Sequence, residues 1–361
     1  MRAALLTRFD APLQVAEVSV ADPDPDEVLV RTVASGICHS DKHAHSGAQP
    51  LGLPMVLGHE ASGIVERVGS AVTYVRPGDR VVTAPAGFCG TCTWCLTGAL
   101  HHCADNGRTR AAGRPPRLSL DGEPVSPFVG LGGFGEQMLV HQSALCRIPE
   151  EMPMDRAALL GCAVITGFGA VLHTAAVRPG QDVAVIGCGG VGLNVVQAAR
   201  FAGARRVVAV DRLPAKLDRA RDFGASHVVD ASSTDAVEAI RELTGGGVDH
   251  AFEVVGAPAT IEQAFAALRP RGTATMVGVP RPDARVTIPP VELLGEKKLQ
   301  GSRLGSSRFR VDVELYCHLY LEGRMRLDDL LSSRIGLDGV SDALLGMDSS
   351  EGARTMIEFP A

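Results

Sequence analysis

Residues 182–192 read DVAVIGCGGVG, and this segment indicates the fold of the residues that follow it. A short apolar run, typical of a buried strand, ends at Gly187, and a helix-like stretch follows at once. In the spacing G-x-G-x-x-G, Gly187 permits a tight turn, Gly189 lets the backbone approach a pyrophosphate, and Gly192 permits close packing of helix on strand. The motif therefore predicts a dinucleotide site at the start of a βαβ unit.

Strand-like and helix-like segments alternate after this motif. Short β-branched strands that alternate with helices of about a dozen residues indicate a parallel sheet, here a doubly wound α/β domain. The predicted strands are residues 182–187, 206–211, 227–230, 248–256 and 272–280, and the predicted helices are residues 191–204, 214–224, 234–247 and 258–270.

Asp211 ends the second of these strands. A carboxylate at this place accepts hydrogen bonds from an adenosine ribose and repels a 2′-phosphate, so the sequence favours NAD over NADP. Arg212 and Lys216 add positive charge nearby and weaken that discrimination.

The first part of the chain has a different pattern. Residues 27–37, 61–69 and 79–85 are short and strand-like, with Pro/Gly turns between them, as in an all-β barrel or sandwich. Residues 104–130 are polar and rich in Gly, Pro and Arg, which predicts a long flap. The C-terminal segments LSSRIGL and ARTMIEF are candidates to return and complete this first domain.

Four cysteines, Cys89, Cys92, Cys95 and Cys103, follow the spacing C-x2-C-x2-C-x7-C. Four thiolates in so short a segment can surround a tetrahedral Zn²⁺ and leave no open position, which predicts a structural site. Two disulfides and an iron–sulfur cluster are the alternatives. Nothing suggests secretion, which disfavours disulfides, and the run lacks the C-x3-C-P ending of a ferredoxin motif.

Composition sets outer limits on the function. The 361 residues suffice for two domains, and the chain is 45% apolar and 21% charged, with a formal net charge of −6. No Lys/Arg run marks a nucleic-acid surface. The N-terminal apolar stretch is too short for a signal peptide and is interrupted by Arg8 and Asp10. We expect a cytoplasmic protein that binds neither nucleic acid nor membrane.

Residues 157–177 contain no Asp, Glu, Lys or Arg and are long enough to span a bilayer. Glycine, threonine and histidine residues dilute the segment, and no basic flank orients it. We expect a buried loop and helix there.

Three further residues form a candidate second metal site: Cys38 in CHSDKH, His59 in GHE and Cys162 in LLGC. Two thiolates and one imidazole leave Zn²⁺ a fourth position for water or substrate, as a catalytic site requires. Spacing alone does not bring these residues together, and a residue of this kind taken by itself is more often a buried core side chain than a metal ligand.

Taken in order, the segments GICHSDKH, GHE, the four-cysteine lobe, LLGC, GCGGVG, AVD and EGARTMIEF resemble the zinc-dependent medium-chain alcohol dehydrogenase family from end to end. The resemblance implies a Rossmann domain at residues 164–303, inserted in a mostly-β GroES-like catalytic domain formed by residues 1–163 and 304–361. It also implies two Zn²⁺ per chain, a catalytic one at Cys38, His59 and Cys162 and a structural one in the lobe at 89–103.

The resemblance also implies roles near the catalytic zinc. Ser40 takes the substrate proton, and His43 passes it through the cofactor ribose to water; the alternative for His43 is an exposed loop residue. Asp41 orients the liganding histidine. Glu60 lies beside the metal and assists ligand exchange, or is simply the buried partner of an arginine.

Cofactor contacts are implied at a larger set of positions. His39 and Arg354 match residues that contact the pyrophosphate, Thr166 and Val191 pack on the nicotinamide, and Val277 and Val279 lie near it. Many relatives have arginine at position 39, so a histidine clamp should weaken as pH rises. With the motif and its following strand, the predicted cofactor residues are His39, Thr166, Gly187, Gly189, Gly190, Val191, Gly192, Asp211, Arg212, Lys216, Val277, Val279 and Arg354.

The predicted activity is reversible hydride transfer from a primary or secondary alcohol to NAD, giving an aldehyde or ketone. Alternatives are a thiol-linked formaldehyde dehydrogenase, a polyol dehydrogenase and a non-catalytic nucleotide-binding sensor. Residues 49–52, QPLG, lack the acidic residues that the formaldehyde subgroup usually carries there. The long flap is typical of dimeric relatives, although tetramers also occur, so we expect a homodimer with a small-molecule alcohol or aldehyde substrate.

Overall fold

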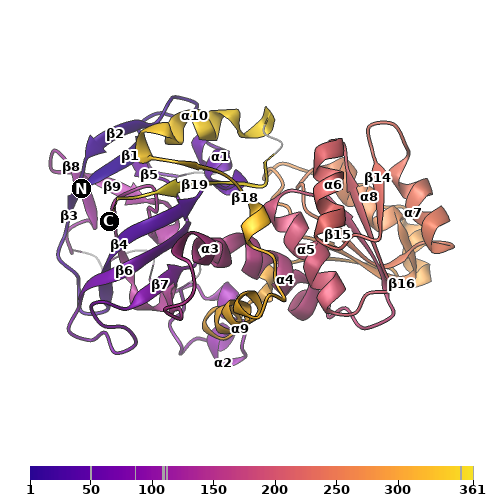
Figure 1. Ribbon diagram of the computed structural model, residues 1–361, viewed down its shortest axis with the longest axis horizontal. Coiled ribbons are helices and arrows are strands. Elements are labelled where there is room, and N and C mark those ends of the chain that lie inside the picture. Colours follow the sequence, from indigo (N-terminus) through magenta and orange to yellow (C-terminus); the bar gives the residue numbers. More distant parts are fainter. Residues whose placement is uncertain (49–50, 86, 108–109, 111–112, 350–351, 361) are drawn as a thin grey trace. The chain divides into compact units, whose positions relative to one another are not determined.

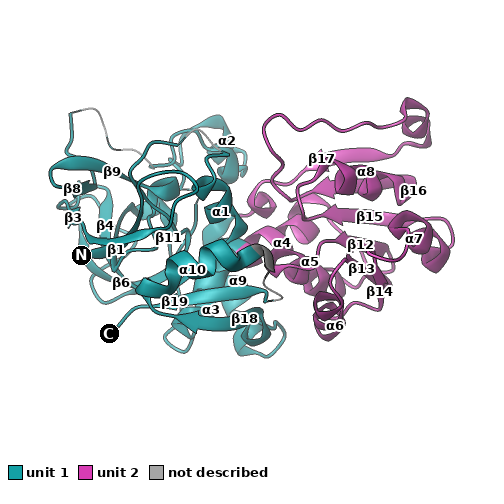
Figure 2. Cartoon of the chain, turned by 90° about the horizontal axis from the view of Figure 1, so that it is seen from above, with its two compact units in different colours: residues 1–162, 308–361 teal, residues 163–307 magenta. Residues whose placement is uncertain are grey.

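The computed structural model describes residues 1–361 except 49–50, 86, 108–109, 111–112, 350–351 and 361 (Figure 1). The chain forms two compact units (Figure 2). Unit 1 comprises Met1–Cys162 and Arg308–Ala361, and unit 2 comprises Ala163–Ser307.

Unit 2 is built on a six-stranded sheet in the order β14-β13-β12-β15-β16-β17, and every neighbouring pair is parallel. Counted from β12, this is the order 3-2-1-4-5-6 of the Rossmann fold, so the predicted doubly wound α/β architecture is confirmed. The strands are β12 (Asp182–Ile186), β13 (Arg206–Asp211), β14 (His227–Asp230), β15 (Val248–Glu253), β16 (Leu268–Met276) and β17 (Lys298–Gly301).

The connecting helices are α5 (Gly190–Phe201), α6 (Pro214–Asp222), α7 (Ala236–Thr244) and α8 (Pro258–Ala266). Local sequence explains their ends. The Asp235 side chain accepts hydrogen bonds from the first turn of α7, and Gly245 ends that helix in the left-handed conformation at φ 72°. Two predicted strands end earlier than expected, because the chain turns away after Glu253 and after Met276. Val277 and Val279 therefore lie in a loop at the carboxyl edge of the sheet, where ligands bind in this fold.

Unit 1 contains two sheets, which confirms the predicted mostly-β architecture. One has the order β2-β1-β5-β9-β8-β3; the other has the order β11-β7-β6-β4-β19-β18, with β10 also paired to β4. The strands are β1 (Arg2–Leu6), β2 (Gln14–Glu17), β3 (Ser19–Val20), β4 (Glu27–Gly36), β5 (Met55–Val56), β6 (Glu60–Val68), β7 (Arg80–Thr83), β8 (Leu118–Leu120), β9 (Glu123–Pro127), β10 (Gln137–His141), β11 (Leu145–Arg147), β18 (Leu331–Ile335) and β19 (Arg354–Glu358).

The C-terminal segment returns to the N-terminal sheet. Strand β19 pairs antiparallel with β4, with Met356 opposite Gly36. The two predicted C-terminal strand segments are β18 and β19, and they pair with each other in parallel. This return places Arg354, the first residue of β19, close to the residues that follow β4.

The apolar segment around residue 160 forms one helix, Met154–Thr174, and not the expected loop and helix. It consists of α3 (Met154–Leu159), a π-helical stretch Leu160–Val164, α4 (Ile165–Gly169) and a second π-helical stretch Ala170–Thr174. By length and composition alone this helix could cross a membrane, but 83% of its apolar window is buried inside the protein, as in the core helix of a soluble protein. The π-helical turn at Leu160–Val164 carries Cys162, and such turns are frequent at functional sites.

The flap is tied to the sheet through Glu27, which begins β4. The Glu27 carboxylate is buried and accepts hydrogen bonds from Arg110 Nη2 at 2.5 Å and from Arg117 Nε at 2.7 Å. Burial raises the pKa of this carboxyl, but the two guanidinium groups outweigh burial and lower it to about 2. Residues 108–109 and 111–112 of the predicted flap lie outside the described part of the chain.

Candidate active site and metal centres

Cys38, His59 and Cys162 come together within unit 1. Cys38 is the N-cap of α1 (His39–His45), His59 immediately precedes β6, and Cys162 lies in the π-helical turn. Their ligand atoms and a carboxylate oxygen of Glu60 all lie within 4.8 Å of one another, and all four residues are buried. The three residues that the sequence could not bring together by spacing thus form one cluster, with Glu60 as a fourth member.

Asp41 holds two members of this cluster in place. Its Oδ1 accepts hydrogen bonds from His59 Nδ1 and from Gly58 N, each at 3.0 Å, and its Oδ2 accepts one from Cys38 N at 2.9 Å. With Nδ1 engaged by Asp41, His59 Nε2 is left buried and without a hydrogen-bond partner among the described residues. Because Nδ1 donates to Asp41, Nε2 presents a lone pair among the thiols, and a buried lone pair of this kind is costly to leave unsatisfied and fits a metal ion.

The electrostatics of the cluster favour the charged forms of Cys38 and His59 and the neutral thiol of Cys162. Burial lowers the pKa of His59, but the charge of Asp41 and its hydrogen bond raise it well above the ordinary value. The hydrogen bond with Cys162 lowers the pKa of Cys38 well below that of a free thiol, and the charge of Arg354 acts in the same direction. The pKa of Cys162 is raised by the same sulfur–sulfur contact. The cluster therefore already favours a thiolate at Cys38, the form that binds metals.

Glu60 and Arg354 form a buried ion pair beside the cluster. Arg354 Nε donates to Glu60 Oε2 at 3.1 Å, and Nη2 donates to Oε1 at 3.0 Å and to Cys38 Sγ at 3.6 Å. Glu60 is thus both a neighbour of the metal-binding atoms and the partner of an arginine. The contact of Arg354 with a cofactor pyrophosphate stays a prediction.

Ser40 and His43 lie one turn apart on α1, on the same side of the helix. The Ser40 hydroxyl is 3.9 Å from Cys38 Sγ, and both Ser40 and His43 are partly exposed. His39, at the start of the same helix, is exposed. Ser40 therefore lies next to a metal-binding sulfur, and the proton relay through Ser40 and His43 stays a prediction.

Phe128 is a contact of the cluster that the sequence did not indicate. Its ring meets the His59 ring edge-on, with centroids 5.6 Å apart and planes at 79°. Such an arrangement is favourable for aromatic pairs. Phe128 is buried, and the following residue, Val129, adopts a left-handed φ of 48°. No sequence spacing links a phenylalanine in the flap to a histidine so far away along the chain.

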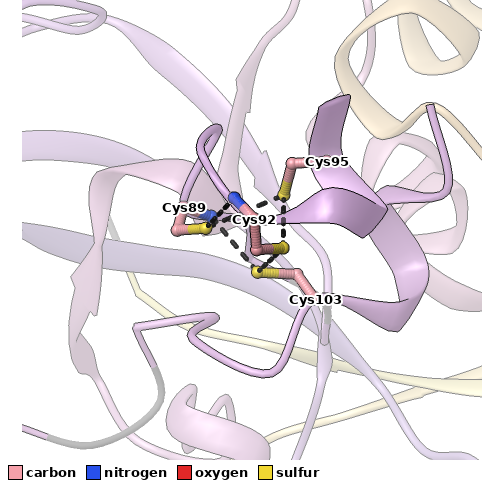
Figure 3. A group of neighbouring side chains, drawn as sticks. All are labelled: Cys89, Cys92, Cys95 and Cys103. Atoms are coloured by element: carbon pink, nitrogen blue, oxygen red, sulfur yellow. Dashed lines mark hydrogen bonds between the residues drawn. The ribbon is translucent and has the colours of Figure 1, made fainter. Parts of the chain in front are cut away.

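The four-cysteine lobe forms the second cluster (Figure 3). The sulfur–sulfur distances are 3.6 Å for Cys92–Cys95 and 3.9 Å for both Cys89–Cys95 and Cys92–Cys103. These are too long for a disulfide, and all nine cysteines of the chain are free. Zn–S bonds of about 2.3 Å place the sulfurs of a tetrahedral site about 3.8 Å apart, which matches.

Neighbouring groups favour a thiolate at one ligand of this lobe, Cys89, whereas burial raises the pKa values of Cys95 and Cys103. The Thr91 hydroxyl and the backbone N–H groups of Thr91 and Cys92 donate to Cys89 Sγ. The Thr91 hydroxyl makes the largest contribution, and together these donors lower the pKa of Cys89 to about 6. Thiolate formation at neutral pH is therefore favoured at the first ligand position.

The glycine motif has the backbone that the sequence predicts. Gly187 has φ 100°, which a side chain would strain, and a Cβ at Gly192 would lie 1.8 Å from Gly187 O. A Cβ at Gly189 would meet nothing within 4 Å, so the space in front of this residue is open. Gly189 is the N-cap of α5, and Gly190 and Val191 form its first turn. An open cradle at a helix N-terminus fits a pyrophosphate.

Asp211 is fixed beside this loop. Its Oδ2 accepts a hydrogen bond from Cys188 N at 2.8 Å, and its Oδ1 accepts from Arg212 N at 2.8 Å and from Leu213 N at 3.1 Å. The carboxylate therefore has one orientation at the end of β13 and retains lone pairs for ribose hydroxyls.

Three predicted nicotinamide contacts differ in their exposure. Thr166 Oγ1 is buried and has no hydrogen-bond partner among the described residues; Val277 is buried, and Val279 is half exposed.

Two family models and several curated relatives match this chain. Residues 24–150 match the alcohol dehydrogenase GroES-like domain family, and residues 190–317 match the zinc-binding dehydrogenase family. The chain is 35% identical to alcohol dehydrogenase class-3 of Myxine glutinosa, covering 99% of this chain and 97% of the relative. It is 34% identical to S-(hydroxymethyl)glutathione dehydrogenase of Escherichia coli, covering 99% of each.

A solved structure agrees with these relatives. Benzyl alcohol dehydrogenase of Acinetobacter calcoaceticus superposes with a TM-score of 0.94 at 31% identity, covering 99% of each chain. Family, fold and cofactor class, as the sequence predicted them, are thereby confirmed. The chain belongs to the zinc-dependent medium-chain alcohol dehydrogenase family and is an NAD- and zinc-dependent oxidoreductase of small alcohols.

Proposed function

We propose that this enzyme oxidises an uncharged primary or secondary alcohol reversibly at the cluster of Cys38, His59 and Cys162. The main support for this proposal is His59 Nε2. This nitrogen is buried, lies close to two thiol sulfurs and has no hydrogen-bond partner among the described residues. Two sulfurs and one nitrogen would hold Zn²⁺ with one position left for substrate. The lobe at Cys89, with its closed set of four sulfurs, would hold the structural ion.

The protein's own residues would position the reaction and move the proton. Bound Zn²⁺ supplies Lewis acidity to the substrate oxygen, and NAD⁺ supplies the hydride acceptor. Ser40 accepts the proton of the alcohol hydroxyl, and His43, one turn along α1, delivers it to water. Asp41 keeps His59 in the tautomer that presents Nε2. Glu60, held by Arg354, stands close enough to assist ligand exchange.

The dinucleotide would lie against the loop after β12. Its pyrophosphate would accept hydrogen bonds at the N-terminus of α5, where Gly189 leaves open space, with His39 and Arg354 as further contacts. Asp211 would accept hydrogen bonds from the adenosine ribose. Thr166, Val191, Val277 and Val279 would contact the nicotinamide, and Arg212 and Lys216 would flank the ribose.

A thiol-linked formaldehyde dehydrogenase is a second candidate, because two relatives carry the names class-3 alcohol dehydrogenase and S-(hydroxymethyl)glutathione dehydrogenase. Residues 49–52 lack acidic side chains, which favours an uncharged alcohol; Gln49 and Pro50 lie outside the described residues. The test is NADH formation by zinc-loaded enzyme with aliphatic, aromatic and polyol alcohols and with S-(hydroxymethyl)glutathione. Faster turnover of a simple alcohol supports the proposal, and activity confined to the glutathione adduct contradicts it.

We also propose a cytoplasmic homodimer. Strand β17 is the end strand of the parallel sheet, and the segment before it exposes apolar side chains at Val291, Leu293 and Leu294. An exposed apolar patch at a sheet edge marks an interaction site, and the same patch on a second copy would cover it. Nine free cysteines suit a reducing compartment. Sedimentation of wild-type protein and of Leu294→Glu tests the dimer: the variant should be monomeric, and a monomeric wild type overturns the proposal.

A further inference from the structure

Glu253 is a buried acidic residue that neither metal cluster nor the glycine motif uses. It is the last residue of β15 and is 1% exposed. Strand β15 lies beside β12, and Glu253 is in register with Ile186, the residue before Gly187. The carboxylate therefore sits at the carboxyl edge of the sheet, next to the loop of the dinucleotide motif.

One oxygen of this carboxylate organises the turn after β15. Oε1 accepts hydrogen bonds from Val255 N at 2.8 Å, from Gly256 N at 2.7 Å and from the Thr260 hydroxyl at 2.7 Å. The other oxygen, Oε2, has no partner among the described residues. Three donors on one oxygen fix the side chain and the turn in a single arrangement.

The backbone of Glu253 organises the neighbouring loop as well. Its carbonyl oxygen accepts hydrogen bonds from Val277 N at 2.8 Å and from Gly278 N at 3.0 Å. These two residues begin the loop after β16. One residue thus holds the loops that follow two adjacent strands of the sheet.

Both loops are packed against residues that line the edge where dinucleotides bind. A Cβ at Gly187 would lie 2.8 Å from Val255 Cγ2, so the held turn touches the first glycine of the motif. A Cβ at Gly256 would lie 2.5 Å from Val279 O, so the same turn also fixes the loop that carries Val279. Any movement of the turn at Val255 and Gly256 would therefore shift Gly187 and Val279 at the edge of the sheet where the dinucleotide is proposed to bind.

We propose that Glu253 is a positioning residue for the dinucleotide: through Oε1 it holds the turn at Val255 and Gly256 against Gly187 and Val279. This inference rests on the NAD-dependent function stated above. Glu253 acts through these neighbours and need not touch the cofactor. The role depends on a hydrogen-bond acceptor at Oε1, which glutamine can also provide and alanine cannot.

The experiment measures the dissociation constant of NADH by fluorescence for zinc-loaded wild type, Glu253→Ala and Glu253→Gln. We expect the alanine variant to bind NADH about tenfold more weakly, a change of about 1.4 kcal/mol. The glutamine variant should bind like wild type. In steady-state kinetics, the KM for NAD⁺ should rise in Glu253→Ala while kcat changes little.

Asp249 provides the matched control, because it lies on the same strand at the amino end. It is also mostly buried, accepts a hydrogen bond from Asp182 N at 2.8 Å and pairs with Arg269. Asp249→Ala should lower the melting temperature without changing the NADH dissociation constant. Thr260→Val removes one of the three donors to Oε1 and should weaken NADH binding less than Glu253→Ala does. If Glu253→Ala does not fold, Thr260→Val tests the proposal in its place.

Several results would overturn the inference: wild-type NADH affinity in Glu253→Ala and in Thr260→Val, an equal loss in Asp249→Ala, or failure of Glu253→Gln to restore binding. A failure of the proposed function can be distinguished from these results. In that case the wild-type protein itself would bind no NADH, or would form no NADH from any alcohol.

Discussion

Arg354 and Glu60, separated by 294 positions in the chain, form a two-point ion pair buried beside the predicted catalytic zinc ligands. Both side chains are almost completely inaccessible, at 3% and 0% relative exposure. Burial raises the pKa of Glu60, and the charge of Arg354 opposes that shift. The pairing of β19 with β4 brings these residues together, so the C-terminal strand contributes directly to the site.

Replacing Arg354 by methionine should destabilise the protein strongly. Removing one partner of a buried pair leaves the other charge uncompensated, at a cost of about 3–5 kcal/mol in the free energy of unfolding. The double variant Glu60→Gln with Arg354→Met should recover much of that loss, because no buried charge remains unpaired. Urea unfolding of the single and double variants measures both values. A single variant as stable as wild type would refute the assignment.

Asp41→Asn should weaken the catalytic zinc site and leave the lobe at Cys89 intact. Asparagine keeps one acceptor but cannot accept from both His59 Nδ1 and Cys38 N, so the orientation of both ligands is lost. Loss of such a partner typically costs about 10–100-fold in metal affinity. Competition with a chelator measures this, and Asp22→Asn, at an exposed site, is the control. Equal retention of both ions by Asp41→Asn would show that Asp41 does not support the metal.

Cys95→Ser should remove the structural ion. The Cys95 sulfur lies within 3.9 Å of two other sulfurs of the lobe, so its loss opens the closed ligand set. We expect zinc content to fall from two ions to one and the melting temperature to fall by several degrees, because structural zinc contributes folding energy. Metal analysis and calorimetry check this. Two ions still bound after the substitution would contradict a four-cysteine zinc site.

The ion pairs of Glu27 should make the free energy of unfolding depend on pH in the acid range. The folded-state pKa of Glu27, about 2, lies below its ordinary value of 4.5, since the pairing with Arg110 and Arg117 outweighs burial. A depressed folded pKa adds stability that is fully present above the unfolded value and is lost as pH falls from about 4.5 towards 2. Glu27→Gln should therefore be less stable at neutral pH and lose less stability across this range. The exposed Glu123→Gln is the control, and an unchanged acid profile for Glu27→Gln would contradict the prediction.

The sequence predicted the elements that depend on local pattern. The glycine motif, the alternation of strands and helices in unit 2 and the compact four-cysteine lobe are each encoded within short windows. The convergence of Cys38, His59 and Cys162 came only from the family resemblance, because residues on separate elements show no spacing. Neither the edge contact of Phe128 on His59 nor the hydrogen bonds of Glu253 has a sequence signal, since both depend on loop geometry.

One feature of the fold also differed from expectation for a physical reason. The apolar segment around residue 160 is one helix with two π-helical stretches, and not the expected loop and helix. Gly167 and Gly169 serve close packing: a Cβ at Gly167 would lie 2.6 Å from Asn194 Cβ, and one at Gly169 would lie 2.3 Å from Gly305 O. These glycines therefore allow close contact between neighbouring elements and do not interrupt the helix.

If the cluster of Cys38, His59 and Cys162 is the catalytic centre, turnover should depend on each of its metal ligands. The most direct measurement is NADH formation from a saturating primary alcohol by zinc-loaded wild type and by Cys38→Ser. Cys146→Ser is the matched control, because Cys146 is buried outside both clusters. We expect Cys38→Ser to lose turnover and one of its two zinc ions, whereas Cys146→Ser should keep its turnover and both zinc ions. Unchanged turnover in Cys38→Ser would contradict this assignment.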